Sequence, residues 1–283
     1  MQAQKHKTGI PEAPQPGYRL VAVDADGTLL NSRNELSDGA EEGLWEARRR
    51  GIHVCLVSGR AKISLMPVLR LLNMDEPFVA SGGAYIEDQR TGDVIDHQCL
   101  AWEDAEAVVH IAREVGASVF FENPDRLYGE LKPRHAHLLH GVDPATVTYL
   151  DDLLGDNLER PSKISVIGEP ERVAQAEQKI RIHNPSLHAV YPFTTCLDVS
   201  RPGAGKGSAV KRLADYLSVP MAQVVAIGDQ DNDISMFQVA GLAVAVGNAP
   251  PHVQAAADAV APSNEEGGVA WALWNLVLKD SSL

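Results

Sequence analysis

The chain has 283 residues, of which 45% are hydrophobic and 22% charged, and its formal net charge is −13. This length allows a sizeable buried core and suits two compact units as well as one. Because 38 acidic residues outnumber 25 Lys and Arg, the chain offers no general basic field for nucleic acid or anionic lipid. We therefore expect neither nucleic acid nor membrane among its partners.

The sequence contains no recognisable targeting or spanning segment. The three cysteines lie far apart, without the spacing of a disulfide framework or a zinc site. The N-terminus lacks the apolar core of a signal peptide, and no stretch approaches the ~20 apolar residues that span a bilayer. We expect residues 1–17 to form a flexible leader, and the protein to be cytoplasmic and monomeric or homodimeric.

Short apolar runs that end abruptly in polar or glycine residues predict strands buried on both faces of a sheet. They occupy residues 19–23, 52–57, 78–80, 224–227 and 243–246. Helical patterns separate them at 38–50, 206–217, 231–240 and 250–257. For the first helix we expect Ser37 as the N-cap and Gly51 as the stop. Strands alternating with helices predict an α/β fold whose ligands bind at the carboxyl ends of the strands.

The middle of the chain has a different pattern. It mixes strand candidates at 118–121 and 163–167 with helices near 101–115 and 170–183. The simplest organisation is a sheet domain formed by 18–85 and 198–283, with an α+β domain, 86–197, inserted between its halves.

Two carboxylates stand close together directly after the first predicted strand. Asp24 and Asp26 are followed at once by Gly27 and Thr28. At ~4 Å and an effective dielectric of ~20, two such charges repel by about 4 kcal/mol, so a buried pair calls for a cation. A solvated Asp-Gly turn is the alternative explanation of this motif alone.

A second acidic cluster, residues 228–233, follows another buried-type strand. An EF-hand loop is excluded, because Ile234 replaces the required glycine and Ala240 the required glutamate. Helix capping explains one or two of these acids but not why two acidic clusters fall at one edge of one sheet. Together they suit Mg²⁺, a hard cation that takes a few carboxylates and keeps some water.

Lys206 lies between glycines at the start of a predicted helix. A phosphate-binding Walker A loop is excluded, because it needs Gly at Ser200 and Ser or Thr at Gly207. A lysine in this position can place a point charge beside a phosphate, and a solvated loop lysine is the alternative.

Four motifs in order resemble those of the haloacid dehalogenase superfamily of phosphatases. They are Asp24-Ala-Asp26-Gly27-Thr28, Ser58-Gly59-Arg60, Lys206 and Gly228-Asp229-x-x-Asn232-Asp233. More narrowly, the chain resembles the Cof-type sugar phosphatases, which carry a type IIB cap between the second and third motifs. The resemblance implies a doubly wound parallel-sheet core with an inserted α+β cap, and a phosphatase acting on small phosphorylated metabolites such as sugar phosphates.

The resemblance also implies a role for each motif residue. Asp24 would be the nucleophile that forms an aspartyl-phosphate, and Asp26 the general acid and base. The Mg²⁺ cofactor would be held by Asp24, the Asp26 backbone carbonyl, Asp229 and Asp233. The phosphate or substrate would be bound by Gly27, Thr28, Ser58, Gly59, Arg60, Lys206 and Asn232. A phosphotransferase or mutase using the same intermediate, and a non-catalytic binding protein, remain alternatives.

The cap is expected to choose the substrate. Its candidate contacts are Arg126, Arg134, His135, His137, His140 and Lys163. We expect these side chains to form a solvated or substrate-facing basic patch rather than a metal site, because no acidic or cysteine ligand accompanies the histidines at usual spacing. Such a patch would favour a second anionic group on the substrate.

Overall fold

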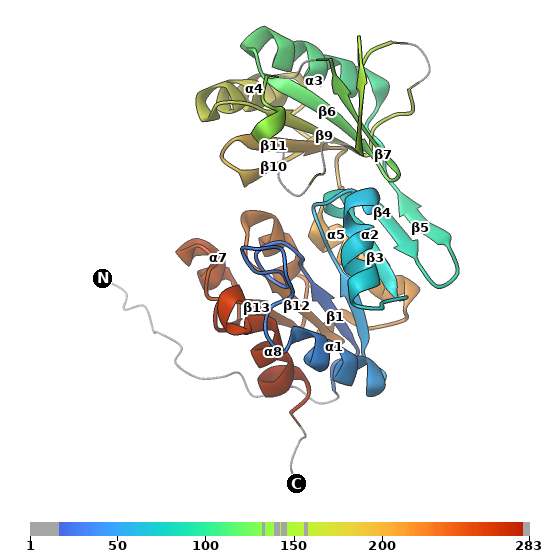
Figure 1. The fold of residues 1–283 in the computed structure, drawn as a ribbon, viewed down its shortest axis with the longest axis vertical. Helices are drawn as coiled ribbons and strands as arrows, with labels where there is room; N and C mark the ends of the chain where they lie inside the picture. Colours follow the sequence, from blue (N-terminus) through green and yellow to red (C-terminus); the bar gives the residue numbers. More distant parts are fainter. Residues whose placement is uncertain (1–16, 132–133, 139–141, 143–145, 156–157, 280–283) are drawn as a thin grey trace.

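A computed structural model describes residues 17–131, 134–138, 142, 146–155 and 158–279. Figure 1 shows two stacked parts, one built from both ends of the chain and the other from its middle. Apart from Gly17, the leader expected over residues 1–17 lies outside the described residues.

The core of the first part is a five-stranded parallel sheet with the order β14-β13-β12-β1-β2. Its strands are β1 (Leu20–Val23), β2 (His53–Leu56), β12 (Val224–Gly228), β13 (Leu242–Ala245) and β14 (Ala259–Val260). Strand β1 lies between β12 and the edge strand β2. The two strands that precede the acidic clusters are therefore neighbours.

Helices cover both faces of this sheet. They are α1 (Ala40–Arg49), α2 (Lys62–Leu71), α5 (Lys206–Tyr216), α6 (Ile234–Phe237), α7 (Pro251–Ala256) and α8 (Gly268–Ala272). Successive strand residues alternate between the faces. Val21 and Val23 pack in one cluster with residues of α1, α2 and α8, whereas Leu20 and Ala22 pack in another with residues of α5, α6 and α7. This confirms the expected doubly wound α/β core.

The start of α1 differs from the prediction. The helix begins at Ala40 after Gly39, whose φ of 68° is left-handed, and no side chain caps it. Ser37 is buried, and its hydroxyl makes no hydrogen bond. The N-cap assignment to Ser37 is therefore wrong, because the chain turns two residues later than the pattern indicates. Gly51 does follow the helix in the left-handed region, with φ 77°.

Two further sheets lie beyond the parallel one. The strands β3 (Pro77–Ala80), β4 (Tyr85–Asp88) and β5 (Asp93–His97) form an antiparallel sheet. A six-stranded sheet has the order β10-β11-β9-β6-β7-β8. Its strands are β6 (Ser118–Asn123), β7 (Arg126–Glu130), β8 (Val147–Leu150), β9 (Lys163–Ile167), β10 (His188–Phe193) and β11 (Cys196–Ser200).

The six-stranded sheet and two helices form the inserted part, which we call the cap. Helices α3 (Trp102–Val115) and α4 (Pro170–His183) pack on one face of its sheet. β4 and β5 extend β3, and β11 runs past residue 197 within the cap sheet. The division of the chain at 85/86 and 197/198 stays a prediction, and strand pairing favours a cap that begins after β5 and ends with β11.

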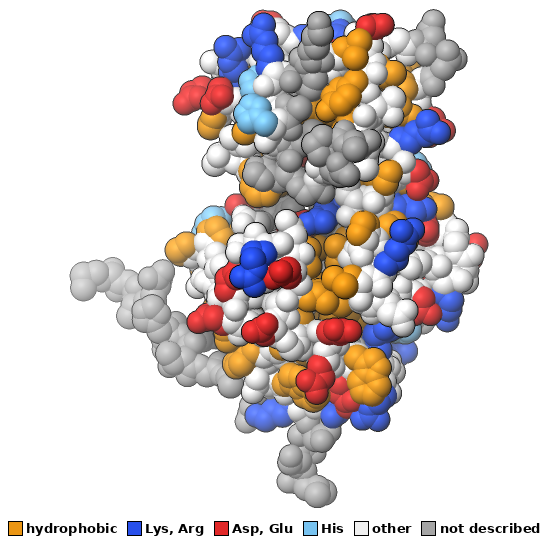
Figure 2. Space-filling model, viewed as in Figure 1, with side chains coloured by type: hydrophobic (Ala, Val, Ile, Leu, Met, Phe, Trp, Pro, Cys, Tyr) orange, Lys and Arg blue, Asp and Glu red, His pale blue; other side chains and the backbone are white. Residues whose placement is uncertain are grey.

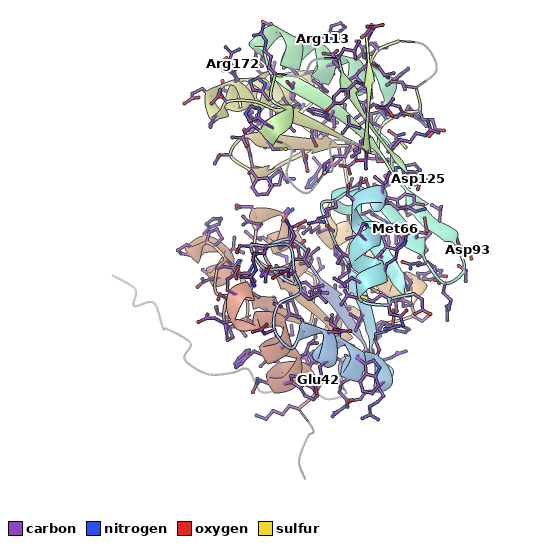
Figure 3. The ribbon with its side chains drawn as sticks, viewed as in Figure 1. Glu42, Met66, Asp93, Arg113, Asp125 and Arg172 are labelled. Carbon is purple, nitrogen blue, oxygen red and sulfur yellow. The ribbon has the colours of Figure 1, made fainter. Side chains whose placement is uncertain are left out.

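The cap and core are in direct contact near the start of α2. The Ile63 amide donates to the Pro124 carbonyl over 2.9 Å, and Lys62 lies 3.5 Å from Asp125. Figure 3 shows Asp125 at the end of the cap nearest α2, the helix that carries Met66. This contact places the β6–β7 turn against the core.

The distribution of charged side chains on the surface agrees with the expectation that the chain has no general basic field. On the face shown in Figure 2, Lys and Arg side chains are scattered among acidic ones rather than gathered in one patch. Across the described residues, every helix is too short or too polar to cross a bilayer.

Gly207 provides a test of the packing that positions Lys206. A Cβ at this position would overlap the carbonyl oxygen of Ser235 just before Met236 of α6. We expect Gly207→Ala to destabilise the protein by about 1–3 kcal/mol, because backbone overlap outweighs the helix preference of alanine. Urea denaturation measures this free energy of unfolding. In the control Gly168→Ala, the new Cβ lies 3.6 Å from its nearest neighbour, so equal losses in both variants would contradict the packing argument.

Candidate active site

Strand pairing brings the first and last acidic motifs together. Val23 of β1 is opposite Ile227 of β12, so Asp24 and Asp229 leave the sheet side by side. The Asp24 amide donates to the Ile227 carbonyl over 2.9 Å. Asp24 and Asp229 are only 4% and 2% exposed. Two carboxylates that are far apart in the sequence thus share one buried site.

Gly27 and Thr28 fit closely around Asp229. Gly27 has φ +76°, and a Cβ there would lie 2.5 Å from the Asp229 carboxylate. The Thr28 hydroxyl donates to Asp229 Oδ1 over 2.8 Å, and Asn248 donates to the Gly27 carbonyl over 2.7 Å. Glycine is therefore required at position 27 both for its backbone conformation and for the close approach of Asp229.

Lys206 links the acidic groups from the first turn of α5. Its ammonium donates to Asp24 Oδ1 over 2.5 Å and to Asp233 Oδ1 over 2.6 Å. The other oxygen of Asp233 accepts the amides of Asp229 and Gln230, each at 2.9 Å. Asp233 therefore organises the loop that carries Asp229, in addition to neutralising Lys206.

These groups leave an excess of buried negative charge. Burial, together with the charges of Asp233 and Asp229, raises the pKa of Asp24 well above its ordinary value, although Lys206 opposes this. Burial and the charge of Asp233 raise the pKa of Asp229 to about 6. Burial would lower the pKa of Lys206, but Asp233 and Asp24 hold it above its ordinary value.

The donor set fits a divalent cation. Carboxylate oxygens of Asp24, Asp229 and Asp233 all lie within 4.8 Å of one another. Three carboxylates against the single ammonium of Lys206 leave two uncompensated negative charges, which a divalent cation would balance. Oxygen ligands in a small buried cluster are the type that Mg²⁺ and similar hard cations take.

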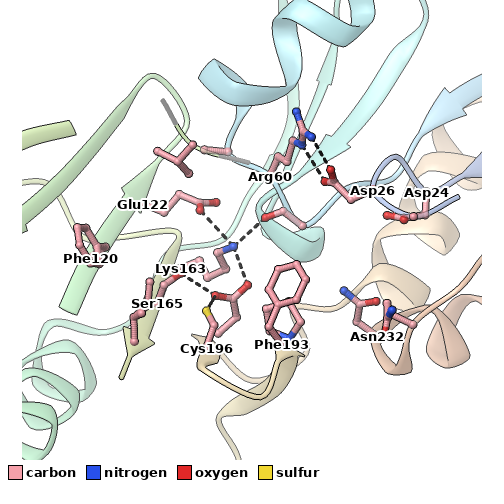
Figure 4. Close-up of a pocket in the computed structure, with 18 of the residues that line it drawn as sticks. Asp24, Asp26, Arg60, Phe120, Glu122, Lys163, Ser165, Phe193, Cys196 and Asn232 are labelled. Carbon is pink, nitrogen blue, oxygen red and sulfur yellow. Dashed lines mark hydrogen bonds and ion pairs between the residues drawn. The ribbon is translucent and has the colours of Figure 1, made fainter. Parts of the chain in front are cut away.

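Asp26 occupies a different position from the other acids. Its side chain is 41% exposed and forms a two-point ion pair with Arg60, whose Nε lies 2.8 Å from Oδ2. The same guanidinium donates to the Asn34 side chain over 3.1 Å. The Arg60 amide in turn donates to the Ser58 hydroxyl over 3.1 Å. The first and second motifs are thus joined through Asp26 and Arg60 (Figure 4).

A cavity of about 360 Å³ lies between core and cap. The predicted site residues that line it are Asp24, Asp26, Gly27, Gly59, Arg60, Lys206, Asp229 and Asn232. Thr28, Ser58 and Asp233 are fully buried beside it and do not line it. Most of the sequence-predicted residues are therefore brought together around one cavity.

Sequence reasoning missed most of the cap side of this cavity. The missed lining residues include Asn31, Asn34, Phe120, Glu122, Leu127, Val147, Ser165, Ile167, Phe193, Cys196, Asp198 and Gln230. One signal was available in the sequence: polar residues alternate with apolar ones in Lys163-Ile-Ser-Val. Such alternation marks a strand with one face turned away from the apolar core.

The basic residues expected on the cap mostly lie outside this cavity. Of those that the structure describes, only Lys163 lines the cavity. Arg126, Arg134 and His137 are exposed, and a ring nitrogen of His135 lies 3.1 Å from the Ser118 hydroxyl. His140 lies outside the described residues.

Comparison with known proteins agrees with this geometry. A profile of the haloacid dehalogenase-like hydrolases matches residues 21–273. Phosphatase YwpJ of Bacillus subtilis is 28% identical over 291 residues, covering 92% of this chain and 100% of that protein. The 5-amino-6-(5-phospho-D-ribitylamino)uracil phosphatase YcsE of the same organism is 26% identical over 264 residues, covering 92% and 96%. A solved haloacid dehalogenase-like hydrolase from B. subtilis superimposes with a TM-score of 0.82 at 27% identity, covering 91% and 99%.

The chain therefore belongs to the haloacid dehalogenase-like hydrolases. Within that superfamily it is a phosphatase that acts on phosphorylated substrates.

The raised pKa of Asp229, about 6, predicts a pH effect in metal-free protein. Between pH ~4 and ~6 the folded state binds more protons than the unfolded chain, so stability falls as pH rises through this window. We expect Asp229→Asn to remove that loss and to be more stable than wild type at pH 7.5 by up to about 3 kcal/mol.

Urea denaturation in EDTA at several pH values measures this difference. Asp151→Asn, at an exposed position, is the control for removing one negative charge. A wild type as stable as Asp229→Asn at pH 7.5 in EDTA would contradict the charge crowding inferred at the site.

Proposed function

We propose that this protein is a Mg²⁺-dependent phosphatase that hydrolyses phosphomonoesters of small metabolites through an aspartyl-phosphate on Asp24. The observation that carries the proposal is the buried group of Asp24, Asp229, Asp233 and Lys206 at the cavity end. The name of the relative YcsE, which specifies a phosphorylated ribityl compound, supports a small metabolite as substrate.

In the first step, a carboxylate oxygen of Asp24 attacks phosphorus, and the bond from phosphorus to the substrate oxygen breaks. Lys206 compensates the charge of Asp24 and of the incoming phosphoryl group, to which backbone amides near Gly27 also donate. Asp24, the Asp26 carbonyl, Asp229 and Asp233 would hold a divalent cation, which when bound would supply charge neutralisation for the approach of two anions.

Asp26 serves as the acid and base in both steps. It donates its proton to the departing oxygen, and then removes a proton from the water that attacks the aspartyl-phosphate. The Asp26 side chain is 41% exposed, lines the cavity and is paired with Arg60. These features support this role. Arg60 acts as a positioning residue, because its planar guanidinium can hold the carboxylate at two points.

Four further residues complete the proposed site: Ser58, Gly59, Thr28 and Asn232. Gly59 and Asn232 line the cavity and can contact the phosphate or its ester group. Ser58 and Thr28 are buried just behind it. The hydrogen bond from Thr28 to Asp229 supports a role in holding the metal ligand.

Asp24→Asn tests the nucleophile. We expect phosphate release from wild-type protein to need Mg²⁺, to stop in EDTA, and to fall at least about 10³-fold in the variant. Phosphate release from a panel of phosphomonoesters is the measurement, with circular dichroism to verify folding. Undiminished release by a folded Asp24→Asn protein would refute the aspartyl-phosphate mechanism.

Arg60→Ala tests the positioning of Asp26. We expect kcat to fall about 10–100-fold for an alkyl phosphate, whose leaving oxygen needs a proton, and much less for 4-nitrophenyl phosphate. Steady-state kinetics with both substrates separates this effect from substrate binding. The control is Arg33→Ala, which removes an arginine that is exposed and paired with Glu35. If Arg60→Ala slowed both substrates equally, Arg60 would act on the phosphate rather than through Asp26.

A further inference from the structure

The three backbone carbonyls of the second motif are bonded by different parts of the molecule. The Ser58 and Arg60 carbonyls accept amides of the core turn Ser81–Gly83, which follows β3, over 3.0 and 2.7 Å. The Gly59 carbonyl, between them, accepts a hydrogen bond over 2.7 Å from the ammonium of Lys163, a residue of β9 in the cap. The cap therefore completes the hydrogen bonding of a loop that belongs to the core.

The cap also covers the residues that follow Arg60. Ala61 is buried in an apolar cluster with side chains of β6, β7, β8 and β9, and Ile63 packs against the same cluster. The Ile63 amide donates to the Pro124 carbonyl of the β6–β7 turn. Arg60 lies between these contacts and is paired with Asp26. The cap thus contacts this core segment on both sides of Arg60.

The cap holds Lys163 in place for its contact with Gly59. Glu122 is opposite Lys163 in the pairing of β6 with β9, and the ammonium lies 3.1 Å from Glu122 and 2.8 Å from Asp198. With the Gly59 carbonyl, these acceptors match the three N–H donors of an ammonium. Burial would lower the pKa of Lys163, but Asp198 and Glu122 hold it above its ordinary value. Lys163 is therefore a charged donor whose position is set by the strands of the cap.

Lys163 is connected to Asp26 through one peptide group. The Gly59 carbonyl and the Arg60 amide belong to the same planar unit. Lys163 holds its carbonyl, and the Ser58 hydroxyl accepts from its amide over 3.1 Å. The orientation of this unit sets the direction in which the Arg60 side chain leaves the backbone toward Asp26. Figure 4 shows Lys163 beside the loop that carries Arg60.

We propose that Lys163 is a positioning residue for proton transfer by Asp26. It fixes the peptide group between Gly59 and Arg60 from the cap, and Arg60 then holds the Asp26 carboxylate in place for the leaving oxygen. Proton transfer by a core residue thus depends on a side chain that only the docked cap supplies. This inference rests on the proposed phosphatase function and adds a residue of the cap to its proton-transfer step.

Lys163→Met tests this role, because it keeps an unbranched stem and removes the ammonium. Benzyl phosphate and 4-nitrophenyl phosphate have similar shapes, but only the departing benzyl alcohol needs a proton. We expect kcat/KM, which reports the steps up to departure of the alcohol, to fall at least about tenfold for benzyl phosphate and less than about threefold for 4-nitrophenyl phosphate. An equal fall for both esters would overturn the proposal, because lost folding or binding affects both alike.

A double-mutant cycle tests whether Lys163 acts through Arg60. Arg60→Ala already removes the group that Lys163 positions. We therefore expect Lys163→Met to lower kcat/KM for benzyl phosphate by less than about twofold when Arg60→Ala is present. Losses that multiply in the double variant would show that the two residues act independently, and would overturn the proposed connection.

Lys62→Met is the matched control. Lys62 also pairs with a buried glutamate, Glu87, at 2.7 Å and reaches the cap at Asp125 over 3.5 Å, but it does not line the cavity. It should keep the wild-type ratio of kcat/KM between the two esters. A change in that ratio as large as in Lys163→Met would mean that any weakened cap contact has the same effect.

A second variant covers the case in which Lys163→Met does not fold, since it leaves Glu122 and Asp198 without their ammonium. Lys163→Met combined with Glu122→Gln and Asp198→Asn removes the charges together, and we expect the same selective loss for benzyl phosphate. A wild-type ratio in this folded variant would overturn the proposal while leaving the phosphatase function intact. Absence of phosphate release from both esters and the wider panel by folded, Mg²⁺-loaded wild type would instead overturn the phosphatase function itself.

Discussion

Lys206 and three buried carboxylates meet at the carboxyl ends of β1 and β12, and the surrounding structure holds these charges together. Charges removed from water are stable only with close partners in good geometry. Here the partners come from three separate segments: the turn after β1, the start of α5 and the loop after β12. The parallel sheet provides that geometry, because neighbouring strands end at one edge and point their loops to the same place.

The buried site keeps an excess of negative charge, and this excess bears on its chemistry. One ammonium does not compensate three carboxylates, so the metal-free site is electrostatically strained, as the pKa of about 6 for Asp229 indicates. A divalent cation bound there, as proposed, would relieve this strain and would make it possible for an anionic phosphate to approach Asp24. Asp26, paired with Arg60 instead of Lys206, lies outside the crowded group. This separation suits one aspartate to attack phosphorus and the other to transfer protons.

In the cap, as in the core, strand pairing decides which side chains lie together. One face of its sheet forms a core with α3 and α4, and the other forms the far wall of the cavity. Lys163 contacts both parts, since it pairs with Glu122 and Asp198 of the cap and donates to Gly59 of the core. Cap and core are thereby joined through one buried side chain that also lines the cavity.

Local sequence patterns predicted much of this molecule. Apolar runs located β1, β2, β3, β12 and β13 to within a residue or so at most ends, and the helices α3 to α5 were close to their observed bounds. The order of the polar motifs located the candidate site. Local patterns predicted less well where contacts with other parts of the chain decide the structure. Ser37 is buried in the folded chain and does not cap α1, which begins after Gly39.

The sequence by itself determined the alternation of strands and helices in the core, the change of pattern in the middle of the chain and the identity of the acidic and lysine motifs, because each depends on residues close together in the chain. Only the tertiary structure decided that Arg60 pairs with Asp26, that Arg134 is exposed and does not line the cavity, and that Glu122 meets Lys163. Glu122 and Lys163 face each other because β6 pairs with β9 in one particular register. That register depends on burying the apolar side chains of both strands at once, which no single stretch of sequence specifies.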